Sequence, residues 1–428
     1  MSASTKQTHR RDGALVLVLL VLALLGSMRL YTLAQGGVGL DFYQFWAVGR
    51  AIQLSPITDI YSADGRSIVA ARMAALAVEQ PQQARLGAAV AARPELELFA
   101  SPLFYAAYGL LARLDYERAH WLHFWLSLFA GFAAVALWGR MLGYRLAMLA
   151  AALAVYYVAF APLAADVSVG NSNQLQMLLL ALAGWALLAR GPLVRDVGAG
   201  LVLGLAALFK PTLALVPLLL IGSRLFERRW SAAARLALGC ALGLPLAAAL
   251  AYPLLGSVEC WAQWISGLGA LGPSTMRWQA GNYSISLLLG KISPLARAVW
   301  QTQVLAALLY VLWRRARRGS AAPVNARGQR DLLLIALGPL ALILLSPLAW
   351  SHYYLLCAPL VLWLFAPLSV RGVALPKMRI VLAAVGLGLL CLPLLLAPLG
   401  LAWYEGFGYC IAALVLVLSC LADRPTSA

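Results

Sequence analysis

Residues 14–34 read ALVLVLLVLALLGSMRLYTLA, and Arg10 and Arg11 precede them. An α-helix needs about twenty predominantly apolar residues to cross the hydrocarbon core of a bilayer, so this stretch predicts a membrane span. Basic residues gather on the cytoplasmic side of spans, which places the N-terminus inside. No small-x-small cleavage site follows a short apolar core, so the pattern indicates a retained anchor and not a signal peptide.

The composition extends this prediction to the whole chain. Of the 428 residues, 63% are hydrophobic and 11% are charged, far from the composition of soluble domains. The net charge of +17 comes mainly from arginines at the ends of apolar stretches, which is typical of cytoplasmic anchoring and argues against nucleic-acid binding. The six cysteines are scattered and imply neither a disulfide nor a zinc site. We expect an all-α, multi-pass protein of a bacterial plasma (inner) membrane, with residues 1–428 as one membrane domain.

The apolar stretches, read together with the arginine pattern, predict about twelve spans with both termini inside. The stretch 197–222 contains Lys210-Pro211. As two short spans that meet at Lys210, it leaves both flanking arginine clusters inside, and proline allows the break. No internal repeat is visible, which disfavours transporters built from repeated halves. The predicted spans lie near 14–34, 119–138, 146–164, 172–189, 197–222 (a pair), 233–255, 298–313, 331–347, 350–368, 379–399 and 403–421.

Two segments between spans are long enough to form outer structure. Residues 36–118 contain no full-length span, and we expect them to form a first extracytoplasmic loop with interfacial helices. The apolar run 101–113 would cover only about 20 Å as a helix, too short for a core of about 30 Å, so we expect it to lie along the membrane surface. Residues 256–297 would form the second sizeable outer loop.

A small set of polar groups reaches the outer face on this topology. Asp41 opens DFYQFWAVGR (41–50), whose aromatics favour the membrane boundary. Lys210, between Phe209 and Pro211, costs several kcal/mol unless it meets an anion or water. The groups brought to one depth are Asp41, Asn171, Ser172, Asn173, Gln174, Lys210, Asn282, Tyr283, Ser284, Trp350, Ser351, His352 and Tyr353. This convergence is the clearest functional signal in the sequence.

Each of these residues also has a structural interpretation. Asp41 and residues 171–174 could cap helices, the Lys210 amine could extend to water, His352 could bond a carbonyl oxygen, and Asn282 could serve a turn. Arg50 could reach a lipid phosphate or pair with a loop acid. Because the other histidines, His9, His120 and His123, fall elsewhere on this topology, we expect no second histidine near His352.

Five segments, taken in order, resemble glycosyltransferase family 87, whose members are polyprenyl-phosphate-mannose-dependent enzymes with the GT-C membrane fold. Single motifs are weak, but the ordered set is fairly specific. The chain departs from the family at Asn171, where Gln is frequent, and at Ser101-Pro102, where a Pro-Pro pair is frequent. The segments are Asp41–Tyr61, Gly170–Asn173, Gly204–Pro211, Asn282–Ser284 and Ser346–Tyr353.

The resemblance implies roles for the polar residues. Asp41 matches the catalytic base, and Lys210 and His352 match residues near the donor phosphate. Apart from the resemblance, we expect Arg50 to add positive charge at the donor phosphate. Such roles suit an inverting transfer, which needs a base for the acceptor hydroxyl and cations for the leaving phosphate. No cofactor and no metal is expected. The residues expected to contact substrate are Asn171, Asn173, Gln174, Asn282, Tyr61 and Trp350.

The resulting expectation is a transferase that moves a hexose, most simply mannose, from a polyprenyl-phosphate donor to an extracytoplasmic lipid or glycan acceptor. A Gly-rich phosphate loop and a nucleotide-binding domain are absent from the sequence, which disfavours a cytoplasmic nucleotide-sugar donor. The alternatives are a pentose or aminosugar transferase or a ligase of GT-C type, a lipid or glycan flippase, and a non-catalytic membrane subunit. Few charges lie in mid-span, which counts against the flippase.

Overall fold

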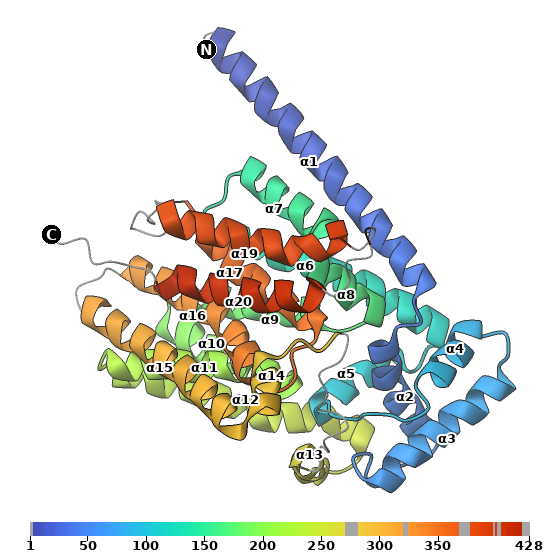
Figure 1. The fold of residues 1–428 in the computed structure, drawn as a ribbon. Helices are drawn as coiled ribbons and strands as arrows, with labels where there is room; N and C mark the ends of the chain where they lie inside the picture. The colour runs from blue at the N-terminus through green and yellow to red at the C-terminus, as the bar shows by residue number, and fades with distance from the viewer. Residues whose placement is uncertain are drawn as a thin grey trace.

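A computed structural model describes residues 3–269, 281–319, 324–367, 377–396, 399 and 404–421. This part of the chain is helical, apart from an isolated antiparallel bridge between Asn282 and Trp350. Helix α1 (Ala3–Gly36) projects from a body in which the later helices pack side by side (Figure 1). The other helices are α2 (Leu40–Leu54), α3 (Ala63–Glu79), α4 (Ala84–Ala92), α5 (Pro102–Leu111), α6 (Tyr116–Met141), α7 (Leu146–Val158), α8 (Ala161–Val169), α9 (Asn173–Leu187), α10 (Ala199–Phe209), α11 (Leu215–Phe226), α12 (Trp230–Leu255), α13 (Cys260–Gly269), α14 (Ile285–Ile292), α15 (Pro294–Gly319), α16 (Val324–Leu345), α17 (Ala358–Leu364), α19 (Lys377–Leu396) and α20 (Tyr404–Leu421).

Several of these helices can cross a membrane. Among the described residues, five are long and apolar enough, and α7 with α8 would add a sixth span that bends by 52°. The architecture is therefore that of an all-helical membrane protein, while the count of about twelve spans and the GT-C fold stay predictions. The five long segments are Gly13–Gly36, Tyr116–Met141, Trp230–Leu255, Pro294–Arg314 and Lys377–Leu394.

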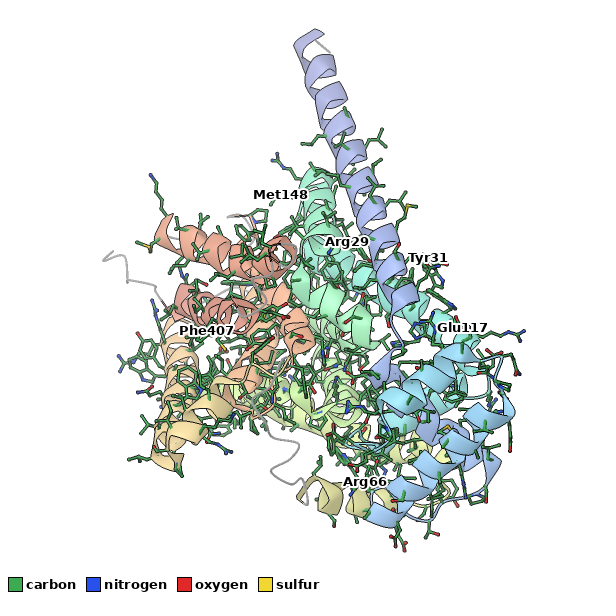
Figure 2. The ribbon with its side chains drawn as sticks, turned by 45° about the vertical axis from the view of Figure 1, so that its right-hand side comes forward. Arg29, Tyr31, Arg66, Glu117, Met148 and Phe407 are labelled. Atoms are coloured by element: carbon green, nitrogen blue, oxygen red, sulfur yellow. The ribbon has the colours of Figure 1, made fainter. Side chains whose placement is uncertain are left out.

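The contact between α1 and α6 is aromatic. The Tyr31 ring centroid lies 4.8 Å from that of Trp121 and 5.9 Å from that of Trp125. Figure 2 labels Tyr31 on the lower part of α1 and Glu117 below it, on the same side of the molecule. Since aromatic pairs add stability beyond the area that they bury, this contact fixes the C-terminal half of α1 against the body.

Helices α2 to α5 form a unit on a hydrophobic core of their own, at the end of the molecule opposite the N-terminus of α1 (Figure 1). Phe45 lies edge-on to Phe104 at 4.5 Å, and Phe104 stacks on Tyr108 at 4.7 Å. Trp264 of α13 joins this core and donates a hydrogen bond to the Phe99 carbonyl at 2.9 Å. Helix α5 is as short as the run 101–113 predicts; its position along the membrane surface stays a prediction.

The chain breaks its helical path at Lys210, between α10 and α11. Lys210 has an extended backbone, and Pro211–Leu213 form a single 3-10 turn before α11 begins. Proline has no backbone N–H group to donate, and its ring clashes with the carbonyl four residues earlier, so a continuous helix is interrupted here. The sequence therefore located the interruption correctly. On which side of the membrane it lies stays a prediction.

Helices α10 and α12 approach each other closely through small residues. A Cβ atom on Gly200 would lie 2.3 Å from the Leu236 carbonyl oxygen, and one on Gly239 would lie 2.2 Å from that of Val197. Glycines spaced by four residues let the backbones of membrane helices touch, and dispersion forces then hold the pair. This packing holds the first turns of α10 against α12.

Candidate active site

The polar residues predicted to share one depth largely meet in one cluster. Asp41 comes from the first turn of α2, Asn171 from the connection of α8 to α9, Lys210 from the break after α10, and His352 from the 3-10 turn Ser351–Cys357. Gly170 makes the turn at the end of α8 possible, because its φ of +69° lies in the left-handed region. The cluster thus depends on three helix ends and one short turn.

Asn171 links the members of this cluster. Its Nδ2 donates to Asp41 Oδ2 at 2.6 Å and to His352 Nε2 at 3.1 Å, and its Oδ1 accepts from Lys210 Nζ at 2.7 Å. The backbone N–H of Ser172 also donates to Oδ1 at 2.7 Å, which fixes the direction of the amide. Since Nε2 of His352 accepts, the ring proton of a neutral His352 belongs on Nδ1.

Asp41 does not cap its helix. The cap position is Gly39, and the Asp41 carboxylate instead turns to residues far away in the chain. Besides its bond to Asn171, Oδ2 lies 3.7 Å from His352 Nε2, while Oδ1 lies 3.9 Å from an Arg93 nitrogen. The capping interpretation of Asp41 is therefore wrong, and its two oxygens face different neighbours.

Lys210 is partly exposed, and it directs its amine to the amide oxygens of Asn171 and Asn173. Its Nζ bonds to Oδ1 of Asn171 at 2.7 Å and of Asn173 at 3.4 Å, and it lies 4.8 Å from the centre of the Tyr353 ring. Amide oxygens and an aromatic face stabilise an ammonium group without neutralising it. The site therefore holds an ammonium group whose charge also interacts with the Asp41 and Asp166 carboxylates.

Asp166 also belongs to the cluster, although it was not among the site residues predicted from the sequence. It is 1% exposed, and its carboxylate accepts from Asn173 Nδ2 at 2.9 Å and from Gln174 Nε2 at 3.4 Å. Asn173 also donates to the His352 carbonyl at 2.9 Å. An acid inside the apolar run 161–169 was the available signal, because a carboxylate in such a segment needs partners.

The segment that carries His352 is fastened by Asn282. The Asn282 side chain is fully buried; its Oδ1 accepts from the Ala349 backbone N–H at 2.9 Å and its Nδ2 donates to the Pro347 carbonyl at 3.5 Å. Trp350 lies parallel to the His352 ring at a centroid distance of 6.4 Å. Asn282 therefore fixes the backbone just before His352 in the chain. Trp350 lies beside the His352 ring.

Two predicted site residues lie outside the cluster. Tyr61 is buried in the core of α2 to α5, where its hydroxyl donates to the Ala100 carbonyl at 2.9 Å. Arg50 follows Asp41 on α2, but none of the polar contacts described for the cluster reaches it, and its buried Nε has no hydrogen-bond partner in the described part of the chain. Within the described residues, neither side chain makes a polar contact with Lys210 or His352.

The expectation that no other histidine lies nearby was wrong. His120 and His123 of α6 line a small cavity together with Asp166, Asn171 and Gln174. The His123 ring also stacks on Phe42 at 4.9 Å. Helix α6 was predicted as a span with these histidines at its outer end, but only its packing against α8 and α9 reveals which way they face. Within the described ranges, no group of three or more His, Cys, Asp or Glu residues is arranged to hold a metal ion.

One comparison with known proteins gave a match. The sequence model of glycosyltransferase family 87 matches residues 101–347, more than half of the 428 residues. Comparisons with curated proteins and with solved structures gave no match. The matched range includes Asn171 and Lys210 but ends before His352 and begins after Asp41. Asn171 and Asn173, both inside the matched range, connect it to these two residues: Asn171 bonds to Asp41 and to the His352 ring, and Asn173 bonds to the His352 carbonyl.

Proposed function

The chain belongs to glycosyltransferase family 87, and from this premise we propose that it transfers a hexose, in the first place mannose, from a polyprenyl-phosphate donor to an extracytoplasmic lipid or glycan acceptor. The observation that carries the proposal is the position of Asn171. It joins a carboxylate, an imidazole and an ammonium group, those of Asp41, His352 and Lys210. These are the groups that transfer from a sugar phosphate to a hydroxyl group requires.

Asp41 acts as the general base of an inverting reaction. The acceptor oxygen attacks the anomeric carbon while Asp41 takes the hydroxyl proton, and the electron pair of the breaking C–O bond leaves with the phosphate. Oδ2 is held by Asn171 at 2.6 Å, so Oδ1 is the oxygen that receives the proton. One carboxylate is sufficient because the sugar is not attached to the enzyme.

Lys210 and His352 act on the phosphate. The Lys210 amine has three N–H groups, and the contacts with Asn171 and Asn173 use two of them. The third donates to a phosphate oxygen and stabilises the charge that grows on the leaving group. His352, whose Nε2 accepts from Asn171, orients or protonates the same phosphate.

An apolar cavity supports a lipid-linked donor. It has a volume of about 260 Å³, is open to the outside, and is lined by residues of α6, α7, α17 and α19, with Met148 and Tyr156 among them. Met148 lies toward the N-terminal half of α1 (Figure 2). A Cβ atom on Gly131 would meet both the Tyr156 hydroxyl, at 2.9 Å, and Gln174 Oε1, at 2.5 Å. The cavity therefore approaches the polar cluster at Tyr156, a suitable path for a hydrocarbon chain.

The proposal is tested with purified protein and radiolabelled polyprenyl-phosphate mannose, with the lipid extract of the source cells as acceptor. We expect labelled mannose in a new glycolipid and an inverted anomeric configuration in its NMR spectrum. Parallel reactions with polyprenyl-phosphate-linked glucose, arabinose and aminosugars define the sugar. Transfer of a pentose or aminosugar but of no hexose would replace the proposal with the alternative transferase, and no transfer from any of these donors would refute it.

A further inference from the structure

Arg93 and Glu97 stand beside the oxygen of Asp41 that Asn171 leaves open. We infer that this pair is the acceptor subsite, in which two neighbouring hydroxyl groups of a sugar or other polyol bind next to Asp41. The inference rests on the proposed function, because it takes Asp41 as the base. It concerns the acceptor, whereas Lys210 and His352 concern the donor.

The geometry places the pair on the side away from Lys210. An Arg93 guanidinium nitrogen lies 3.9 Å from Asp41 Oδ1, while Asn171 and His352 approach Oδ2. Arg93 Nη1 donates to Glu97 Oε2 at 3.2 Å. A hydroxyl group that gives its proton to Oδ1 therefore comes within reach of both side chains of the pair.

Exposure increases from the cluster toward this pair. The side chain of His352 is 7% exposed, that of Asp41 17%, that of Arg93 26% and that of Glu97 38%. Arg93 and Glu97 thus stand where the cluster opens to solvent. A donor held between Lys210 and the apolar cavity occupies the buried side, so the acceptor enters past this pair.

The pair is held in place by the fold. Gln44, which follows Asp41 on α2, accepts the backbone N–H of Glu97 at 2.9 Å. Arg93 is the C-cap of α4, and Arg85 in the first turn of α4 donates to the Ala34 carbonyl at 2.8 Å at the end of α1. Helix α4 is therefore attached at both ends, and the pair keeps its distance from Asp41 without needing a ligand.

The chemistry of the pair fits hydroxyl groups better than an anion. A hydroxyl group both donates and accepts, so two neighbouring ones can bond to a guanidinium and a carboxylate together. A phosphate would be attracted by the Arg93 charge but repelled by the charges of Glu97 and Asp41. Nη2 of Arg93 lies 3.9 Å from Asp41 Oδ1, too far for a direct hydrogen bond, and is the donor that would serve the ligand.

The experiment compares Arg93→Gln and Glu97→Gln with the wild type and with Arg118→Gln, which removes an arginine that is 80% exposed and bonds to Asp115. Transfer from polyprenyl-phosphate mannose to the source-cell lipid extract gives apparent KM values for donor and acceptor. The inhibition constant of polyprenyl phosphate reports the donor side separately.

We expect either substitution at the pair to raise the acceptor KM about tenfold, the scale of a charge-assisted hydrogen bond. The donor KM and the inhibition constant should stay within about twofold, Arg118→Gln should match the wild type, and Arg93→Lys should restore part of the loss.

The sign of the Glu97→Gln effect is decisive. If an anionic group of the acceptor binds Arg93, loss of the Glu97 charge lowers the acceptor KM, and the hydroxyl subsite is refuted. A raised donor KM in Arg93→Gln would move the pair to the donor side, and unchanged values in both variants would remove it from the site. A wild type that transfers no sugar would refute the proposed function itself, an outcome that differs from all of these.

Discussion

The side-chain amide of Asn171 donates to Asp41 Oδ2 at 2.6 Å, although 130 positions separate the two residues in the chain. This bond holds one carboxylate oxygen and turns the other toward Arg93. It also couples Asp41 to Lys210, because the same amide accepts from the Lys210 amine. A carboxylate and an ammonium group are thus positioned by one neutral side chain between them.

Asp41→Asn should abolish transfer without unfolding the protein. The amide keeps the shape of the carboxylate but cannot take a proton, and loss of a general base typically costs about 10²- to 10⁴-fold in rate. The measurement is turnover with polyprenyl-phosphate mannose, together with the inhibition constant of polyprenyl phosphate, which should be unchanged. Asp64→Asn, at an exposed acid in the first turn of α3, is the matched control. Comparable turnover of Asp41→Asn and the wild type would exclude Asp41 as the base.

Asn171→Asp should be more harmful than Asn171→Ala. An aspartate cannot donate to Asp41, and it places a second negative charge at the 2.6 Å contact. We expect a loss in kcat/KM of at least about a hundredfold for Asn171→Asp and a smaller one for Asn171→Ala. The control is Ser168→Ala, which removes a hydroxyl bonded to the Ala165 carbonyl of the same helix. Equal activities of the two Asn171 variants would show that donation to Asp41 does not matter.

Lys210→Met should weaken use of the donor. Methionine keeps the apolar stem but loses the charge, which costs about 1.5–3 kcal/mol where a charge-assisted bond to phosphate is lost. The donor KM and the inhibition constant of polyprenyl phosphate should both rise, while the acceptor KM stays constant. Lys291→Met, at an exposed lysine of α14, serves as control. Wild-type constants in Lys210→Met would remove Lys210 from the phosphate site.

Asp196→Asn should destabilise the fold at the start of α10, away from Lys210 at the end of that helix. Asp196 lies in the π-helical turn Leu193–Gly198, fully buried, within 3.2 Å of Arg195 and Arg224 and within 2.9 Å of Arg235. Breaking a buried ion pair by removing one partner typically costs about 3–5 kcal/mol. The free energy of unfolding in detergent should fall by this amount, whereas Glu259→Gln, at an exposed acid, should leave it unchanged.

The effect at Asp196 should also depend on pH. Burial raises the pKa of Asp196, but hydrogen bonds and charge from the surrounding arginines outweigh burial and leave the pKa below its usual value. A depressed pKa contributes stability above the unfolded-state pKa, and this stability disappears as the pH falls through the folded-state pKa. The difference in the free energy of unfolding between the wild type and Asp196→Asn should therefore become smaller as the pH falls. A difference that stays constant into strong acid would contradict the ion-pair explanation.

The sequence was sufficient for the features that depend on local pattern. The run 14–34 is long and apolar in any context, and the Lys210-Pro211 pair interrupts a helix because proline lacks an N–H group. Asp41, Asn171, Lys210 and His352 were recognised because polar groups beside apolar runs must find partners. The family resemblance, seen first in short motifs, agrees with the match over residues 101–347.

Tertiary packing alone decided which of these groups meet and which others join them. Arg93 follows an Ala-rich helix and has no sequence feature that links it to Asp41; the link exists because Arg85 and Gln44 fasten both ends of the segment. Tyr61 lies within the same family motif as Asp41, yet its side chain is buried in the hydrophobic core of α2 to α5 and not in the polar cluster. A contact between residues far apart in the chain depends on how whole helices pack, because side chains on one helix diverge over its surface and only the neighbouring helices select which face becomes the site.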